Sequence, residues 1–207
     1  MFSLEGIMSE LSKERRIFHS EADFQHALAM KISKIYPKLN IRVEYNPWGE
    51  EDNQHIDLWI IDKQEEFAIE LKYKKRQILY EENGEKFILN SQHAQDIARY
   101  DFCKDIKKLE SIKSNKDNFT KYAIFLTNDH LYWDLSNYNT NDDNFRIHDG
   151  KELTGTLKWH LNASEGTKNN RDEDISLNGK YNLKWNDYSD IPNQKNGKFR
   201  YLLVKTS

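Results

Sequence analysis

The sequence predicts an α/β fold in which a mixed central β-sheet is flanked by helices and followed by additional C-terminal strands. Two long segments, 20–37 and 91–113, carry apolar residues at helical spacing. Short apolar runs typical of strands lie between these segments and after them. No stretch rich in Pro, Gly and Ser sets the later strands apart, so we expect them to extend or cover the same core.

The composition is that of a folded domain with a polar surface. The 207 residues suit one large domain or a domain with an appended subdomain, and 13% aromatic residues argue against disorder. A formal net charge of −3 counts against non-specific packaging of nucleic acid, although a nuclease needs only local basic groups. The single cysteine, Cys103, excludes an internal disulfide framework and a Cys-based zinc site.

Two further classes of protein are not expected. The first residues lack the continuous apolar segment of a signal peptide, and no run approaches the roughly 20 apolar residues of a membrane span. We therefore expect a cytoplasmic protein with no membrane contact. The sequence leaves the oligomeric state open, and a homodimer or a larger complex fits it equally well.

The N-terminal elements follow from capping and periodicity. Residues 1–19 are an N-terminal segment that forms either a short helix or a loose tail. The next helix is capped by Ser20 and ends at Pro37. Its predicted buried face consists of Phe24, Leu28, Ile32 and Ile35. Strands are expected over 41–47, 55–62 and 65–74, and a hairpin over 77–90 turns at Asn83-Gly84.

The remaining elements complete a core over 20–129 and a β-rich extension of the same domain over 130–207. A long helix over 91–113 and an apolar strand over 121–129 end the core. In the extension, strands are expected over 156–161, 179–185 and 198–206. Its aromatic residues either join the core, which we favour, or stack on bases; they are Trp159, Trp185 and Tyr188.

Charged residues interrupt the most apolar pair of strands. A hairpin that turns through 62–65 places Asp57 directly opposite Glu70, with Lys72 on the same face. Facing carboxylates repel each other, and a divalent cation removes this penalty. The alternative is a solvent-facing edge with ordinary surface charge. Against it, the same face also carries Trp59, Ile61 and Ala68.

This pattern resembles the PD-(D/E)XK, or restriction-endonuclease-like, nuclease superfamily. An acid, Asp57, is followed after twelve residues by Glu70-Leu71-Lys72, with Ile56 where the motif has proline. The resemblance covers about 20–129 and implies a core of order α-β-β-β-α-β. It further implies a Mg²⁺- or Mn²⁺-dependent endonuclease acting on DNA, in which Asp57, Glu70 and the Leu71 carbonyl bind the metal. Lys72 then assists the attacking water.

The resemblance also implies further site residues on two helices. Glu21 matches the metal-contacting acid of the first helix, although an acid there also complements the helix dipole. Gln95 matches a catalytic glutamine of the second helix. Arg99 stands where those relatives carry tyrosine, and it either holds a phosphate or pairs with a carboxylate.

Other basic residues are candidates for contacts with nucleic acid. Lys74, Lys75 and Arg76 follow the motif directly and suit a polyanionic backbone, or they are a solvated strand end. The lysines of the long helix, including Lys108, are interpreted as its wet face. Two alternatives to the nuclease stay open: a non-catalytic nucleic-acid-binding or assembly subunit of the same fold, and an unrelated α/β interaction module.

Overall fold

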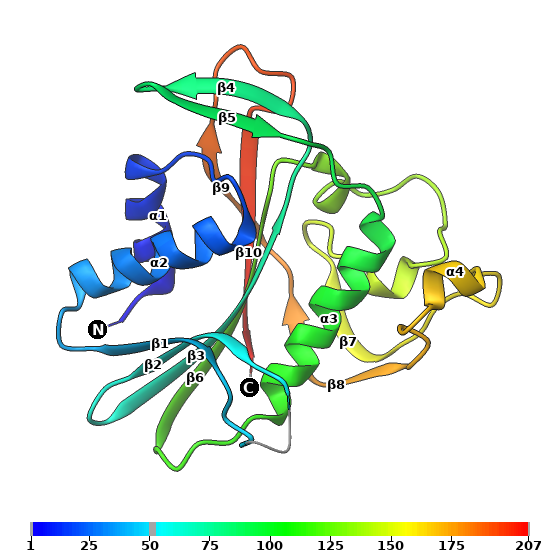
Figure 1. Cartoon of the computed structure of the whole chain (residues 1–207). Helices are drawn as coiled ribbons and strands as arrows, with labels where there is room; N and C mark the ends of the chain where they lie inside the picture. Colours follow the sequence, from blue (N-terminus) through cyan, green and yellow to red (C-terminus); the bar gives the residue numbers. More distant parts are fainter. Residues whose placement is uncertain (1, 50–52, 207) are drawn as a thin grey trace.

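The computed structural model describes residues 2–49 and 53–206, and Figure 1 shows a central sheet with helices on both sides. The helices are Leu4–Glu14 (α1), Glu21–Ile35 (α2), Gln95–Ser111 (α3) and Glu165–Lys168 (α4), with 3₁₀ turns His130–Tyr132 (η1) and Asp143–Phe145 (η2). The strands are Asn40–Tyr45 (β1), Ile56–Ile61 (β2), Glu65–Lys74 (β3), Ile78–Glu82 (β4), Glu85–Leu89 (β5), Asn118–Thr127 (β6), Glu152–Leu157 (β7), Ile175–Asn182 (β8), Trp185–Asp190 (β9) and Lys198–Thr206 (β10).

The main sheet has six strands in the order β1-β2-β3-β6-β10-β9. Strands β1, β2 and β3 form an antiparallel meander, whereas β3 and β6 run parallel. A parallel pair needs a crossover connection, which here contains the β4–β5 hairpin and α3. The expected α/β fold with a mixed sheet and flanking helices is confirmed, and β9 and β10 extend that sheet.

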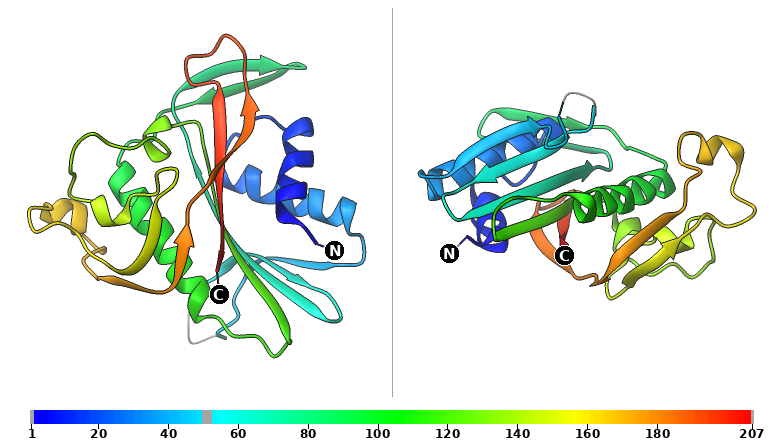
Figure 2. Two further views of the ribbon diagram at one scale, coloured as in Figure 1. Left: turned by 180° about the vertical axis from the view of Figure 1, so that it is seen from behind. Right: turned by 90° about the horizontal axis from the view of Figure 1, so that it is seen from below.

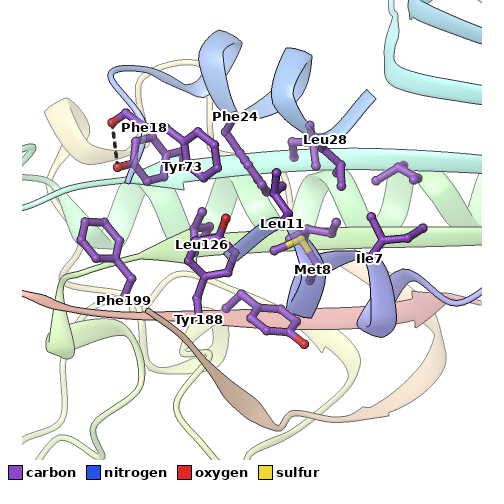
Figure 3. Packing of buried hydrophobic residues seen from close by; sticks show 14 of the residues in the cluster. Ile7, Met8, Leu11, Phe18, Phe24, Leu28, Tyr73, Leu126, Tyr188 and Phe199 are labelled. Carbon is purple, nitrogen blue, oxygen red and sulfur yellow. Dashed lines mark hydrogen bonds between the residues drawn. The ribbon is translucent and has the colours of Figure 1, made fainter. Parts of the chain in front are cut away.

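Each face of the sheet has its own hydrophobic core. On one face, α1 and α2 cover residues such as Ile69 and Leu71, and Figure 3 shows Phe18, Phe24 and Tyr73 in this layer. On the other face, α3 packs on β3 and β6, and β8 packs against α3 and β10; Figure 2 shows α3, β7 and β8 on this side of the sheet. Residues such as Ala68 belong to this second core. Side chains of β3 therefore alternate between two buried layers, and a charged residue in mid-strand is enclosed on either face.

The N-terminal segment forms the helix α1, not a loose tail, because it has an apolar face to bury. Leu4, Ile7, Met8 and Leu11 are all buried against the first core. The cap of α2 is as expected, since the Ser20 side chain accepts a hydrogen bond from the Asp23 amide at 3.1 Å. The prediction for Ile35 is wrong: it is 40% exposed because α2 ends there and the chain turns away.

Two boundaries differ from those expected. The long helix begins at Gln95 and not at 91, because Ala94 has left-handed backbone angles with φ of 67°. The strand expected over 156–161 is also wrong, since β7 ends at Leu157. Beyond it, the Trp159 ring stacks on Tyr100 with centroids 5.5 Å apart, which turns the chain out of the strand.

The C-terminal aromatic residues belong to the core. Trp185 is 3% exposed and Tyr188 is 6% exposed, while Trp159 packs partly buried against the second core. The segment expected to be one strand over 179–185 contains the end of β8 and the first residue of β9. Aromatic burial here confirms the favoured interpretation over base stacking.

The hairpin turn offers a test of local backbone strain. Asn83 and Gly84 have φ of 52° and 82°, so both central residues are left-handed, as a type I′ turn requires. We expect Gly84→Ala to lower the free energy of unfolding by about 1 kcal/mol, because alanine disfavours this conformation. Urea unfolding measures it. Gly166→Ala, in α4 and without positive φ, is the control, and an equal loss in both variants would contradict the account.

Candidate functional site

The charged residues of β2 and β3 meet where the two strands part. Leu58 lies opposite Ile69 and Trp59 opposite Ala68, which is the expected register. The paired ladder ends at Leu58 and Ile69. Asp57 and Glu70 occupy the next position, so they stand at the mouth of a gap between the strands.

Two carboxylates accept hydrogen bonds from backbone amides of β3 that do not pair with β2. The Leu71 amide donates to Asp57 Oδ2 at 2.5 Å, and the Tyr73 amide donates to Glu21 Oε2 at 2.6 Å. Glu21 is the first residue of α2, so the start of that helix reaches this edge. The amide and carbonyl of one strand residue point to the same side, so the Leu71 carbonyl also faces the gap.

Helix α3 covers the face that carries Glu70 and Lys72. Glu70 is 4% exposed, and its Oε1 lies 2.6 Å from Lys108 Nζ. Lys72 Nζ lies 3.1 Å from Asp105 Oδ2, one turn earlier on α3. The interpretation of this face as a solvent-facing edge is therefore wrong, because a helix and the second core enclose it.

The enclosed acids hold their protons more tightly than ordinary carboxyls. Burial, followed by the charges of Asp105 and Asp57, raises the pKa of Glu70 well above its ordinary value despite Lys108. Burial also raises the pKa of Asp57 to about 6, against the hydrogen bond from Leu71 that lowers it. Two neighbouring carboxyls that both resist ionisation form a site where added positive charge is favourable.

Lys72 behaves in the opposite way. Burial alone disfavours its charged form, but the carboxylates of Asp105, Glu21 and Asp57 outweigh burial and raise the pKa of Lys72 above its ordinary value. The amine is therefore a permanent cation at neutral pH. It is held over the same face as Glu70 by a partner from α3.

Sequence reasoning missed both α3 partners. Asp105 received no role, and the assignment of Lys108 to the wet face of the helix is wrong, since it pairs with Glu70. The two residues lie three apart on one side of the helix. An acid and a base at this spacing, complementary in charge to Lys72 and Glu70, form a pattern that would have identified them.

A third missed residue is Glu44 in β1. It lies between Val43 and Tyr45, which pair with β2, and has a φ of 51°, as in a local bulge. Its Oε1 accepts from Gln25 Nε2 at 2.7 Å, and the same Gln25 nitrogen donates to the Asp57 carbonyl at 2.9 Å. Glu44 therefore adds negative charge beside Asp57.

The structure places Gln95 away from Glu70. Gln95 Nε2 donates to the buried Asp129 at 2.9 Å, and Arg76 Nε lies 3.0 Å from the same Asp129 oxygen. Gln95 precedes Asp105 by ten residues, or roughly 15 Å along the helix axis. Gln95 and Arg76 thus meet at the carboxyl-terminal end of β6, and not at the gap between β2 and β3.

The other basic residues predicted to contact nucleic acid lie in two different places. Arg99 is 4% exposed and pairs with Asp142 at 2.5 Å, which is the carboxylate-pairing alternative. Lys75 Nζ donates to the His19 carbonyl at 2.5 Å, and Lys74 ends β3. Lys74 and Lys75 are therefore at the end of the strand that carries Glu70 and Lys72.

The donors at the gap suit a hard divalent cation. They are oxygen atoms of Asp57, Glu70 and the Leu71 carbonyl, and Mg²⁺ is commonly held by one or two carboxylates with waters. Within 2–49 and 53–206, no group of three or more His, Cys, Asp and Glu side chains is arranged to hold a metal. A cation would thus depend on two carboxylates, with Glu70 released from Lys108.

The pKa of Asp57 predicts a pH-dependent effect of Asp57→Asn. Between pH 3.8 and about 6 the folded protein keeps a proton that the unfolded chain has lost, so this carboxyl's contribution to stability falls as pH rises. We expect Asp57→Asn to gain stability relative to the parent by about 2–3 kcal/mol over this interval. Urea unfolding from pH 4 to 7 measures it, with exposed Asp117→Asn as control. A constant difference would contradict the account.

Comparisons with known proteins place the chain in no family. Scans against protein-family models, curated proteins and solved structures find no match to the chain. No helix in the described part of the chain is long and apolar enough to cross a membrane. The function is therefore argued from the geometry of the gap itself.

Proposed function

We propose that the protein is a divalent-metal-dependent endonuclease that hydrolyses phosphodiester bonds, with DNA as its substrate. The observation that carries the proposal is the placement of Asp57 and buried Glu70 directly beyond the last pair of the β2–β3 ladder, with Lys72 held by Asp105 on the face of Glu70. The helix, three-strand meander, crossover helix and parallel strand around them match the order of a restriction-endonuclease-like core. We propose that core for α2 to β6.

The residues would divide the chemistry as follows. Asp57, Glu70 and the Leu71 carbonyl would hold Mg²⁺ or Mn²⁺, which when bound stabilises charge on a phosphoryl oxygen and acidifies water. Lys72, fixed by Asp105, would orient the attacking water and stabilise negative charge on the phosphate. Glu21 would hold the edge of β3 through the Tyr73 amide.

Basic residues near the gap would bind the backbone of the substrate. Lys74 is the last residue of β3 and alternation places it on the same face as Lys72, so a strand held there would pass the carboxylates. Lys75 follows the strand directly, and its Nζ donates to the His19 carbonyl, so it would contribute less. Arg76 is partly committed to Asp129 and would contribute less. A cytoplasmic location, and a homodimer or larger assembly, stay predictions.

One observation favours a second candidate, a non-catalytic subunit of the same fold. Lysines from within the chain already neutralise the acids, Lys108 at Glu70 and Lys72 at Asp105. A site closed in this way by its own cations has no need of a metal. The two candidates differ in whether a divalent ion displaces Lys108.

Cleavage assays test the proposal directly. The full chain is incubated with supercoiled plasmid, linear duplex, single-stranded DNA and RNA, each with Mg²⁺, Mn²⁺ or EDTA. We expect cleavage of DNA with Mg²⁺ or Mn²⁺ and none with EDTA. Cleavage that persists in EDTA, or an inert protein that also fails to bind a divalent ion, would sink the nuclease and favour the non-catalytic subunit.

A further inference from the structure

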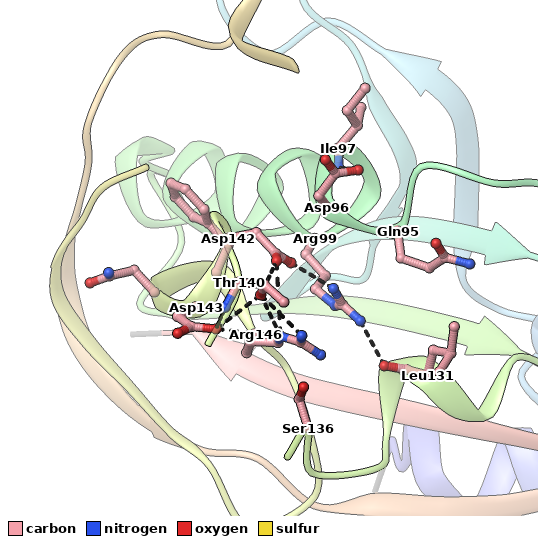
Figure 4. Close-up of polar contacts among 12 residues, drawn as sticks. Gln95, Asp96, Ile97, Arg99, Leu131, Ser136, Thr140, Asp142, Asp143 and Arg146 are labelled. Carbon is pink, nitrogen blue, oxygen red and sulfur yellow. Dashed lines mark hydrogen bonds and ion pairs between the residues drawn. The ribbon is translucent and has the colours of Figure 1, made fainter. Parts of the chain in front are cut away.

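A cavity of about 550 Å³ lies between the first turns of α3 and the segment 130–146, and we call it the α3 cavity. Figure 4 shows the Arg99 side chain of the helix meeting Thr140, Asp142 and Arg146 of the segment that follows η1. The residues used below are Gln95, Arg99, Tyr138, Thr140, Asn141 and Arg146, all of which line it. Neither Asp57 nor Glu70 does, so the cavity is separate from the gap.

The base of the α3 cavity is a rigid, buried ion pair. Arg99 donates to Asp142 Oδ2 at 2.5 Å and to the Leu131 carbonyl at 2.6 Å. Both charged side chains are 4% exposed, and Thr140 Oγ1 donates to the other Asp142 oxygen at 2.5 Å. Arg99 Nε is buried without a hydrogen-bond partner among the described residues. The loop is thus tied to α3 by charge.

A second guanidinium, that of Arg146, is less fully engaged. Its Nε and Nη2 donate to Thr140 Oγ1 at 3.3 and 3.0 Å, but its nearest carboxylate oxygens, on Asp142 and Asp143, are 3.9 Å away. Burial, and then the charge of Arg99, lower the pKa of Arg146. The lining also carries the carboxylates of Asp96 and Asp134, so the place for an added anion is the Arg146 guanidinium, which has no carboxylate oxygen closer than 3.9 Å.

The rim of the α3 cavity supplies the other half of a ligand site. Tyr138 is 81% exposed, so its ring is free to stack on a planar group without loss of core packing. The side-chain amide of Asn141 lines the same space and offers a donor and an acceptor, and Gln95, whose Nε2 donates to Asp129 at 2.9 Å, adds an amide oxygen. An aromatic platform, amides and a guanidinium in one cavity suit a ligand that joins a heterocyclic base to a phosphate.

We propose that the α3 cavity binds a nucleoside phosphate, with the phosphate on Arg146 and the base stacked on Tyr138. The unit is either one nucleotide of a polynucleotide strand or a free mononucleotide. A strand as the source rests on the proposed function, whereas the site itself does not. In the strand case, the cavity holds a nucleotide at the first turns of α3, and Gln95 and Arg99 there lie roughly 15 and 9 Å along the helix axis from Asp105.

Binding measured without catalysis tests the site. The full chain in EDTA is titrated with dAMP and, separately, with a fluorescein-labelled single-stranded 12-mer, followed by calorimetry and anisotropy. We expect Tyr138→Ala to raise Kd about fivefold or more, because it removes the stacking platform, while Tyr138→Phe leaves Kd unchanged. We expect Arg146→Gln to raise Kd about tenfold, with Arg42→Gln on the exposed edge strand β1 as the matched control.

The outcomes separate the two proposals. Binding of both ligands, or of the 12-mer alone, with the expected losses supports a strand nucleotide, and binding of dAMP alone supports a free nucleotide. No binding of either ligand, or a Kd that Tyr138→Ala and Arg146→Gln leave unchanged, overturns the site. If binding survives while no substrate is cleaved, the nuclease fails and the α3 cavity stands.

Discussion

Glu70→Gln and Lys72→Ala should each reduce metal-dependent cleavage by about a thousandfold or more. Glu70→Gln removes one of the two carboxylates proposed to hold the cation and keeps the size of the side chain. Lys72→Ala removes the cation that Asp105 fixes beside the gap. Initial rates on a DNA substrate at saturating Mg²⁺ measure both losses.

Matched substitutions nearby separate chemistry from folding. Glu65→Gln, at the start of the same strand, and Lys63→Ala, in the turn before it, should retain the parental rate. Circular dichroism and urea unfolding of all four variants show whether they are folded. Parental rates in Glu70→Gln or Lys72→Ala would remove the gap from the mechanism, and equal losses in the controls would show a general defect.

Lys108→Met should destabilise the metal-free protein, because it leaves Glu70 buried without its cation. Breaking a buried pair from one side costs about 3–5 kcal/mol when the remaining charge persists. The pKa of Glu70 is already raised by burial, so protonation limits the loss, and we expect about 2–3 kcal/mol at pH 8. Urea unfolding in EDTA measures the loss.

A divalent ion should restore part of what Lys108→Met removes. If Lys108 and the cation compete for Glu70, the variant binds Mg²⁺ more tightly than the parent and gains more stability from it. Lys104→Met, at an exposed lysine of the same helix, is the control and should change neither quantity. Stability that is lost in Lys108→Met and unaffected by Mg²⁺ or Mn²⁺ would favour the non-catalytic subunit.

The parts of the fold that local patterns determine could be predicted. Alternation in β3 and the short turn before it determine the register that brings Asp57 level with Glu70. The Asn83-Gly84 turn and the Ser20 cap are similarly local, since each depends on residues within one turn. The segments that failed depend on distant contacts: Trp159 leaves the expected strand to stack on Tyr100.

The same distinction holds for the candidate site. Asp57, Glu70 and Lys72 lie on adjacent strands, so their shared face follows from strand geometry. Asp105 and Lys108 reach them only because α3 docks on that face, and a sequence pattern does not give the rotation of a docked helix. Gln95 was expected at the site and lies elsewhere. It is the first residue of α3, which places it beside Asp129 and not beside Glu70.

The central claim is that Asp57 and Glu70 together hold a divalent cation, and titration calorimetry tests it most directly. Mn²⁺ is titrated into the full chain, Asp57→Asn, Glu70→Gln and the Glu65→Gln control in metal-free buffer. The account predicts one Mn²⁺ site per chain in the parent and the control, and its loss in both Asp57→Asn and Glu70→Gln. Undiminished binding in either variant, or no binding by the parent, would contradict it.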